Sequence, residues 1–347
     1  MNPPDEDETL KSMKIAVVGG GSWGTALANL LAFKGYFIDL WVYETEVAAQ
    51  INDDHENRYF LPGIQLSQNV RATHQISECV GQKDLVLLVV PSHVMRTVCR
   101  QLAEHLSAES ILVSASKGIE NETCRTMSGV IRETLPEGSQ HRIGVLSGPS
   151  FAREVAQKHP TAVTAASTQL EVAALIQRVF ATPYFRVYTN DDVLGVELGG
   201  AVKNVVAIAS GVIDGLGLGL NTRAALITRG QTEIRRLGVA LGANPRTFTG
   251  LAGIGDLILT CTGTLSRNYT LGVKIGQGKQ LTEILGEMRM VAEGVENARS
   301  VYTLSRKEGV EMPICHEMYQ ILYHGRSPKD AVYRLMTREL KQELDDQ

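Results

Sequence analysis

A glycine-rich turn near the start of the chain has the residue types and spacing that bind a pyrophosphate. Gly19, Gly21 and Gly24 fit the pattern GxGxxG. The first glycine permits a tight turn, the second lets a pyrophosphate approach the backbone, and the third allows close packing of helix against strand. The helix that begins near Ser22 adds free N–H groups and the positive end of its dipole. The turn therefore predicts a dinucleotide site, with an ordinary glycine-rich turn as the alternative.

An acidic residue follows this turn at the distance expected for ribose recognition. Glu44 comes twenty positions after Gly24, at the expected end of the second strand, where a carboxylate can accept hydrogen bonds from an adenosine ribose. A 2′-phosphate would be repelled there, and residues 45–50 contain no Arg or Lys, which favours NAD over NADP. Tyr43 could lie beside the adenine or simply pack at the strand end.

Three further loops each follow a predicted strand, so they are expected at the same edge of the sheet as the coenzyme. The first contains His93, which could be an acid or base but more often such a residue packs or hydrogen-bonds locally. The second carries Lys117 to a place where an anion or a polarised carbonyl would lie. The third contains Gly148 and Ser150, whose backbone N–H groups could bind an anionic oxygen; a capped turn is the alternative.

The second half of the chain places a lysine and an aspartate in apolar surroundings. Lys203 is flanked by valines at 202, 205 and 206, and desolvation there would lower its pKa toward neutrality and make it a usable proton donor or acceptor. A lysine that reaches solvent is the alternative. Asp256 also has apolar neighbours and needs a partner, most simply a lysine. Gly199 lies inside a predicted helix, which indicates that a cofactor or the other domain presses close.

A short polar run later in the chain has the donors of a phosphate site. Ser266, Arg267 and Asn268 place a guanidinium between a hydroxyl and an amide, a combination that suits phosphate oxygens. Three residues alone have little specificity. The polar loop at 291–296 suggests no chemistry from its residues.

Alternating strands and helices should position the residues of the first half. Apolar runs without polar alternation occur at 15–18, 37–43, 85–90, 111–114 and 143–146, which is typical of strands buried on both faces of a parallel sheet. A helical stripe over 22–34 connects the first two runs. This pattern predicts an α/β domain with a doubly wound Rossmann-type sheet.

The pattern changes at the polar cluster 190–192, which suits a helix cap. Beyond it strands are scarce, and helices are predicted at 193–213, 223–241, 281–288, 296–307, 312–323 and 328–335. We therefore predict a dinucleotide-binding domain over 13–190 and an all-helical substrate and catalytic domain over 191–340.

The composition excludes several other classes of protein. The chain has 347 residues, 44% of them hydrophobic and 21% charged, as in globular proteins of two domains. A net charge of −4 disfavours a nucleic-acid binder, and the apolar runs are far shorter than the ~20 residues of a membrane helix. The acidic N-terminus lacks a secretory signal. No metal-ligand spacing is found, and the scattered cysteines predict reduced thiols in the cytoplasm; they are Cys79, Cys99, Cys124, Cys261 and Cys315.

Taken together, these segments resemble the NAD(P)-dependent glycerol-3-phosphate dehydrogenases of the bacterial soluble type. The resemblance runs in order over about 13–325, which makes it highly specific. The blocks that carry it are GGGSWGTALA from Gly19, VPSHV from Val90, SKGIE from Ser116, LSGPSFAREV from Leu146, ELGGAVKNVVAIASG from Glu197, NTRAALITRG from Asn221, GLAGIGDLILTC from Gly250, SRN from Ser266 and VAEGVENA from Val291.

The resemblance implies an enzyme that interconverts dihydroxyacetone phosphate and sn-glycerol 3-phosphate by hydride transfer at C2, supplying glycerol 3-phosphate for phospholipid synthesis. It implies that Lys203 is the general acid/base and that Lys117 stabilises negative charge on the C2 oxygen. The predicted catalytic residues are thus Lys203, Lys117 and Asp256. The further predicted substrate contacts are Gly148, Ser150, Asn204, Thr260, Ser266, Arg267 and Asn268. The predicted coenzyme contacts are Gly19, Gly21, Ser22, Trp23, Gly24, Tyr43, Glu44, Lys117, Ala152, Arg267, Val291 and Glu293.

The predicted enzyme binds NAD or NADP on its first domain and holds the substrate in the cleft against the second. Bacterial members often accept NADP, so the coenzyme preference stays open, as does a homodimer. One alternative is a related dehydrogenase of a 3-hydroxy acid or a phosphogluconate-like sugar acid. Another is an NAD(H)-sensing protein without catalysis. The set of Lys117, Lys203, Asp256 and Arg267 favours the phosphorylated triose.

Overall fold

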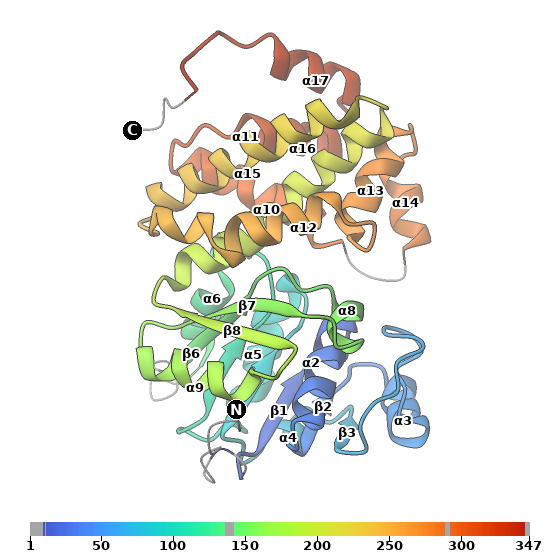
Figure 1. Ribbon diagram of the computed structural model, residues 1–347, viewed down its shortest axis with the longest axis vertical. Coiled ribbons are helices and arrows are strands. Elements are labelled where there is room, and N and C mark those ends of the chain that lie inside the picture. The colour runs from blue at the N-terminus through green and yellow to red at the C-terminus, as the bar shows by residue number, and fades with distance from the viewer. Residues whose placement is uncertain (1–9, 11, 136–141, 289–291, 344–347) are drawn as a thin grey trace. The chain divides into compact units, whose positions relative to one another are not determined.

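The computed structural model describes residues 10, 12–135, 142–288 and 292–343 (Figure 1). By contacts between residues the chain divides into two compact units. Unit 1 consists of Met1–Ser116 and Met127–Val193, and unit 2 of Lys117–Thr126 and Leu194–Gln347. The last junction, between Val193 and Leu194, lies within a few residues of the boundary expected near 190. The Lys117 segment (Lys117–Thr126) corrects the sequence-based division, because it was assigned to the first domain and belongs to unit 2.

Unit 1 is built on a single sheet with the strand order β3-β2-β1-β4-β5-β6-β7-β8. Its neighbours pair in parallel except for β6 and β7. This order, with β1 in the interior and crossovers on either side of it, confirms the doubly wound Rossmann-type fold. The strands are β1 (Ile15–Val18), β2 (Ile38–Trp41), β3 (Val70–Thr73), β4 (Leu85–Leu88), β5 (Ile111–Ser114), β6 (Ile143–Ser147), β7 (Thr161–Ala166) and β8 (Phe185–Asn190).

Strands β3, β7 and β8 were not predicted from the amino-acid sequence, for a physical reason. The edge strands β3 and β8 alternate buried and exposed residues over most of their length, because only one of their faces is covered. They therefore lack the continuous apolar run by which the central strands are recognised. Strand β7 carries two threonines among its apolar residues, which weakens the same signal.

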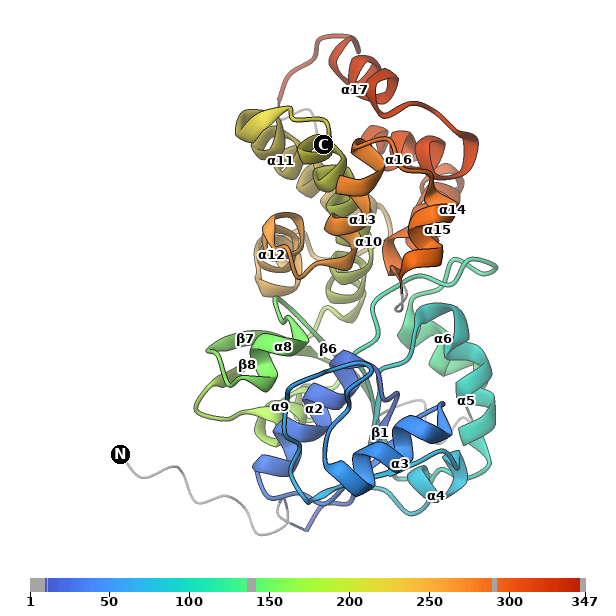
Figure 2. The same cartoon turned by 90° about the vertical axis from the view of Figure 1, so that its right-hand side faces the viewer.

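Helices cover both faces of this sheet (Figures 1 and 2). Alternate residues of β1 divide between two cores: Ile15 and Val17 belong to one, Ala16 and Val18 to the other, as the two-residue period of a strand requires. The first core includes α2 (Ser22–Phe33), α3 (Thr45–Asp54), α8 (Ala152–Ala156) and α9 (Leu170–Phe180). The second includes α4 (Ile76–Val80), α5 (Met95–Ala103) and α6 (Met127–Thr134), with the short turn η1 (Ser92–Val94) before α5.

In the described part of unit 2 the regular elements are all helical, as predicted, apart from one isolated β-bridge between Ile119 and Thr126. Each of the six helices expected from the sequence is present, with ends shifted by a few residues. The helices are α10 (Val193–Gly215), α11 (Gly219–Ala240), η2 (Pro245–Thr249), η3 (Leu251–Gly255), α12 (Asp256–Thr262), α13 (Arg267–Gly276), α14 (Leu281–Glu287), α15 (Glu293–Lys307), α16 (Pro313–His324) and α17 (Pro328–Met336).

The helix α10 is the centre of unit 2 and contributes the longest run of residues to its core. By length and composition α10 could cross a membrane, with a mean hydropathy of 1.5 over its most apolar window, but that window is wholly buried inside the protein. So long an apolar stretch was not expected from the sequence, where the longest apolar runs were far shorter than a membrane helix. Burial on every side explains its composition, since a helix surrounded by others needs no polar face.

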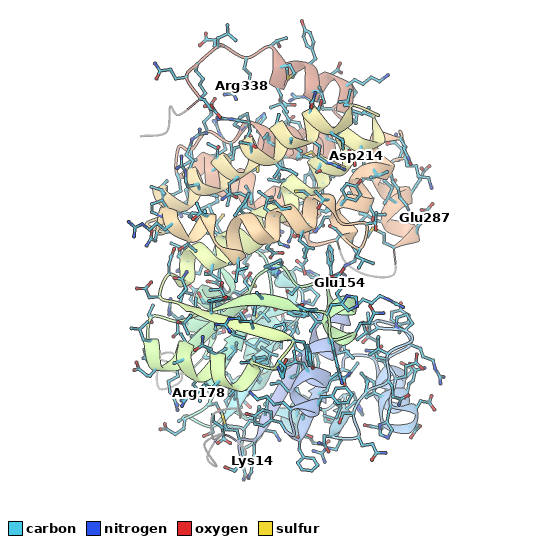
Figure 3. All side chains as sticks on the ribbon, in the orientation of Figure 1. Lys14, Glu154, Arg178, Asp214, Glu287 and Arg338 are labelled. Atoms are coloured by element: carbon cyan, nitrogen blue, oxygen red, sulfur yellow. The ribbon has the colours of Figure 1, made fainter. Side chains whose placement is uncertain are left out.

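Two glycines let α13 cross α10 with the backbones in contact. A Cβ at Gly211 would lie 2.0 Å from the carbonyl oxygen of Tyr269, and one at Gly272 would lie 2.0 Å from that of Ile208. Near the crossing lies Asp214 of α10, which is labelled in Figure 3. It accepts hydrogen bonds from Arg223 of α11 and from Tyr269 of α13. The start of α13 is thereby held at a set distance from α10.

Candidate active site

The glycine turn of unit 1 has the geometry that a bound pyrophosphate requires. Gly19 has φ +123°, and a Cβ there would lie 2.5 Å from the carbonyl oxygen of Val89, so only glycine fits. A Cβ at Gly24 would lie 1.8 Å from the carbonyl oxygen of Gly19, since α2 packs directly on the turn. A Cβ at Gly21 would meet nothing within 4 Å. The fold therefore needs glycine at 19 and 24, whereas the open space at 21 suits a ligand that approaches the backbone.

A buried asparagine that was not predicted from the sequence holds this turn in place. Asn57 is fully buried, and its Nδ2 donates to the carbonyl oxygen of Gly20 at 2.8 Å and to Thr25 Oγ1 at 2.9 Å. Its Oδ1 accepts from the N–H of Phe60 at 3.0 Å. Because Asn57 lies far along the chain from the turn, no local pattern could have identified it.

The other predicted coenzyme residues of unit 1 differ in what surrounds them. Tyr43 is 79% exposed and Glu44 is the N-cap residue of α3, beyond the end of β2. The buried Nε1 of Trp23 has no hydrogen-bond partner among the described residues. The hydroxyl of Ser22 donates to the carbonyl oxygen of Phe60 at 2.7 Å. Ser22 thus has a local structural role that the motif alone does not reveal.

Unit 2 brings two lysines onto one buried carboxylate. Asp256 is 1% exposed. Its Oδ2 accepts from Lys117 Nζ at 2.7 Å and its Oδ1 from Lys203 Nζ at 2.7 Å. Thr260 Oγ1 lies 2.6 Å from Lys203 Nζ and donates to the backbone carbonyl of Asp256 at 2.6 Å, so it accepts from the lysine. Two ammonium groups and one carboxylate leave an excess positive charge at this Lys–Asp–Lys cluster, which favours an anionic ligand.

Burial lowers the pKa of Lys203, as the flanking valines lead one to expect. It lowers the pKa of the Lys203 ammonium from its usual 10.5 to about 8. The charge of Asp256 and the hydrogen bond to it oppose this change, and the charge of Lys117 adds to it. A lysine with a pKa near 8 can both give and take a proton near neutrality.

Close contact between two backbones sets Asp256 beside Lys203. A Cβ at Gly199 of α10 would lie 2.5 Å from the carbonyl oxygen of Ala252, in the wide π-type turn η3 that leads directly into Asp256. The glycine is explained by this turn of the same unit, which corrects the expectation of a cofactor or the other domain. Such wide turns are frequent at functional sites.

The predicted phosphate residues lie at the start of α13. Ser266 is the N-cap residue, and its Oγ accepts from the N–H of Tyr269 at 3.2 Å. Arg267 is exposed to solvent, but the protein atoms around its guanidinium lower its pKa, an effect that Glu293 opposes. Asn268 is buried and its Oδ1 accepts from the N–H of Gly294 at 3.0 Å. This bond fixes Oδ1 as the acceptor side of the Asn268 amide, so its Nδ2 is the side that can donate.

Asn204 and Asn268 converge on one glycine. A Cβ at Gly294 would lie 2.7 Å from the carbonyl oxygen of Asn204 and 2.8 Å from Asn268 Oδ1. Asn204 follows Lys203 on α10, and Asn268 follows Arg267 on α13. Helices α10 and α13 therefore come together at Gly294. The structure thus brings the backbone at Asn204 and the side chain of Asn268 to the same glycine.

The chain matches two family models that together cover most of its length. One, described as NAD-dependent glycerol-3-phosphate dehydrogenase N-terminus, matches residues 14–173, and the other, described as the C-terminus of the same enzyme, matches residues 192–333. The chain belongs to the NAD-dependent glycerol-3-phosphate dehydrogenase family. The resemblance inferred from the sequence blocks is thereby confirmed.

Individual relatives agree with this assignment. A protein of Citrifermentans bemidjiense named glycerol-3-phosphate dehydrogenase (NAD(P)+) is 57% identical over 330 residues, which cover 95% of this chain and 98% of the relative. A protein of Geobacter metallireducens with the same name is 58% identical over 330 residues, which again cover 95% of this chain and 98% of the relative. The crystal structure of glycerol-3-phosphate dehydrogenase from Coxiella burnetii superposes with a TM-score of 0.90 at 37% identity, covering 94% of this chain and all of that one.

The remaining residues carried over from the family have local structural roles or lie outside the described part of the chain. Gly148 has φ +145°, and a Cβ there would lie 2.9 Å from Cα of Val163, so the fold itself requires glycine. Ser150 Oγ donates to the carbonyl oxygen of Gly148 at 3.0 Å. Ala152 is the first residue of α8, and Glu293 the first of α15. Val291 lies outside the described residues.

Two residues singled out in the sequence have no evident part in the chemistry. His93 is exposed in η1. Cys261 is buried beside the Lys–Asp–Lys cluster, and desolvation raises the pKa of its thiol to about 12. Because only the thiolate is a good nucleophile, a thiol with so high a pKa is inert near neutrality. Among the described residues no group of three or more His, Cys, Asp and Glu could hold a metal ion.

Proposed function

We propose that the Lys–Asp–Lys cluster is the catalytic centre of this chain. As a member of its family the chain is an NAD(P)-dependent oxidoreductase that interconverts dihydroxyacetone phosphate and sn-glycerol 3-phosphate, the precursor that the family supplies to phospholipid synthesis. One observation supports the assignment of roles: Lys117 and Lys203 hold the two oxygens of the same buried carboxylate, each at 2.7 Å.

In ketone reduction Lys203 is the proton donor to the C2 oxygen. Its ammonium donates one hydrogen to Asp256 Oδ1 and one to Thr260 Oγ1, which leaves a third for the substrate. The pKa of about 8 lets it release this proton near neutrality and, in the reverse reaction, lets the neutral amine accept it from the alcohol. Lys117 adds a positive charge that stabilises negative charge developing on the C2 oxygen. The bound coenzyme supplies or accepts the hydride at C2.

The residues of the glycine turn fit a nicotinamide dinucleotide. Open space at Gly21, together with the glycines that the fold requires at 19 and 24, supports a pyrophosphate held on the N-terminus of α2. Glu44 and the exposed Tyr43 would face the adenosine end, and the carboxylate favours NAD over NADP. We propose that Lys117, Arg267 and Glu293 complete the coenzyme contacts; each belongs to unit 2.

The substrate phosphate is assigned to Arg267 and Asn268, with Ser266 beside them. The guanidinium supplies a permanent charge and paired donors, and the Asn268 amide presents its Nδ2 because its Oδ1 is held by Gly294. Gly148 and Ser150 of unit 1 are proposed as further substrate contacts. These residues should bind a doubly charged phosphate more tightly than a singly charged carboxylate, so we expect a substrate with only a carboxylate to bind less well.

The cell compartment and assembly are also proposals. A slightly acidic chain with five cysteines, none of them paired in a disulfide, fits the cytoplasm. Its partners are a small-molecule substrate and a coenzyme, with no role for nucleic acid or membrane insertion. A homodimer is compatible with this function and is not required by it, since the Lys–Asp–Lys cluster is complete within one chain.

The experiment that tests this function compares wild-type protein with Lys203→Ala. Loss of NADH absorbance after addition of dihydroxyacetone phosphate measures turnover, and Lys203→Ala should lower it by about 10²-fold or more. Coenzyme binding, followed by titration of NADH fluorescence, should not change. Lys329→Ala, at an exposed position of α17, is the matched control. Near-normal turnover in Lys203→Ala would remove Lys203 from its role, and faster turnover of a 3-hydroxy acid by the wild type would favour that class of dehydrogenase.

A further inference from the structure

One buried side chain connects the two lysines through the backbone. Asn297 lies on α15 and is fully buried. Its Oδ1 accepts from the N–H of Ile119 at 3.4 Å, and its Nδ2 donates to the carbonyl oxygen of Ala201 at 3.1 Å. Ile119 comes two residues after Lys117, and Ala201 two residues before Lys203. A single amide therefore joins the Lys117 segment to the helix that carries Lys203.

The chemistry of its two neighbours determines the orientation of this amide. The Ile119 N–H can only donate and the Ala201 carbonyl can only accept. A reversed amide would set donor against donor and acceptor against acceptor at a fully buried position. Both bonds consequently depend on an asparagine in this one orientation.

A second contact and a packed side chain attach the same segment to unit 2. Asn121 Nδ2 donates to Glu296 Oε2 at 2.6 Å, one residue before Asn297 on α15. The Ile119 side chain is 1% exposed and belongs to the core that surrounds α10. Glu296 holds the segment beyond Ile119, while Asn297 holds the part nearest to Lys117.

We infer that Asn297 is a positioning residue for the reaction, which acts by keeping Lys117 on Asp256 and opposite Lys203. The inference rests on the proposed function, because it assumes that Lys117 stabilises charge on the substrate oxygen. Asn297 itself is not assigned to substrate or coenzyme. Its effect on catalysis passes through the backbone at Ile119 and at Ala201.

Loss of the amide has two expected consequences at the cluster. Without it the Lys117 segment is free to shift against α10, and a misplacement of about 1 Å in a catalytic group can lower kcat by about 10²-fold. The charged groups that face Lys203 are Asp256 and Lys117, with the neutral Cys261 thiol beside them. Since the charge of Lys117 lowers the pKa of Lys203, moving it away should raise that pKa.

The test is a double-mutant cycle on kcat with Asn297→Ala, Lys117→Ala and the double variant. Asn297→Ala should lower kcat by about 10–100-fold and change KM for dihydroxyacetone phosphate much less. In the Lys117→Ala background the same substitution should change kcat by less than about twofold, since the two residues act as one unit. The pH at which the rate of glycerol 3-phosphate oxidation rises should move upward in Asn297→Ala and in Lys117→Ala alike.

Ser300→Ala is the matched control, because Ser300 is also fully buried on α15 and its Oγ donates to the carbonyl oxygen of Asn297 at 3.3 Å. It should lower stability without moving the pH profile. If Asn297→Ala does not fold, Asn297→Asp, which has nearly the same volume and still accepts from Ile119, enters the cycle on kcat alone, because its negative charge could by itself move the pH profile. The inference would be overturned if Asn297→Ala lowered kcat by the same factor with and without Lys117. An unchanged pH profile in Asn297→Ala would also overturn it. Absence of turnover in the wild type would instead overturn the proposed function.

Discussion

Replacing Lys203 by methionine should remove a pH-dependent contribution from the stability of the protein. The buried ammonium has a pKa of about 8 in the folded protein, against 10.5 ordinarily. Between these two values the unfolded chain binds the proton and the folded chain does not, so the free energy of unfolding rises with pH. A difference of about 2.5 in pKa corresponds to about 3 kcal/mol at about 1.36 kcal/mol for each pKa unit. Lys203 is 5% exposed, so solvent screening reduces this little.

The sign of the effect is specific to a cation held in a dry site. Below about pH 8 both states hold the proton, and the folded protein bears the full cost of burying the charge. As the pH rises above 8, Lys203 loses its proton in the folded protein but keeps it in the unfolded chain, so the folded protein no longer has a buried charge. An exposed lysine, or one stabilised mainly by its ion pair, would give no change or a change of opposite sign.

The assay is urea unfolding of wild type and Lys203→Met at several values between pH 7 and pH 10. The signal should be far-UV circular dichroism, because both tryptophans, Trp23 and Trp41, lie in unit 1 while unit 2 is helical. The stability of the wild type relative to Lys203→Met should increase with pH over this range, by about 2–3 kcal/mol. Groups far from the Lys–Asp–Lys cluster titrate alike in both proteins and cancel in the difference. A difference that stays constant or decreases with pH would refute the argument that burial controls the pKa of Lys203.

Three further predictions concern the ligand sites. Arg267→Ala should mainly raise KM for dihydroxyacetone phosphate, and an unchanged KM in steady-state kinetics would place the phosphate elsewhere. Gly21→Ala should weaken NADH binding at unchanged stability, because a Cβ there meets nothing within 4 Å. Gly24→Ala should instead destabilise the fold by about 1–3 kcal/mol, because its Cβ would lie 1.8 Å from the carbonyl oxygen of Gly19; denaturant unfolding and NADH titration separate the two. Initial rates should be higher with NADH than with NADPH at equal concentrations. Glu44→Ser should lower the ratio of the NADH rate to the NADPH rate. A higher rate with NADPH in the wild type would contradict the role of Glu44.

Much of the fold was predictable because its signals are local. The central strands are continuous apolar runs, and the helices of unit 2 carry their own periodicity, so their positions could be inferred from short windows. The edge strands β3 and β8 were missed because one of their faces is solvated and their runs alternate. The glycine turn was predictable because its strand, turn and helix are consecutive in the chain.

Some of the chemistry was likewise predictable from local sequence, and some depends on contacts between distant segments. The valines around Lys203 already indicate desolvation, and the apolar neighbours of Asp256 already call for a cation. That this cation is both Lys203 and Lys117, 53 and 139 positions away, appears only in the folded chain. Asn57 and Asn297 could not have been found from local patterns, because their side chains bind backbone groups from distant segments.

The amino-acid sequence by itself determined the class of fold, the coenzyme turn and the residue types available for catalysis, since each of these depends on neighbours within a few residues. Only the tertiary structure decided that the Lys117 segment leaves unit 1 to join the helical unit, and that one buried carboxylate holds both lysines. The physical reason is that hydrogen bonds such as the one from Ile119 to Asn297, 178 positions apart, form between segments that meet only when the core packs.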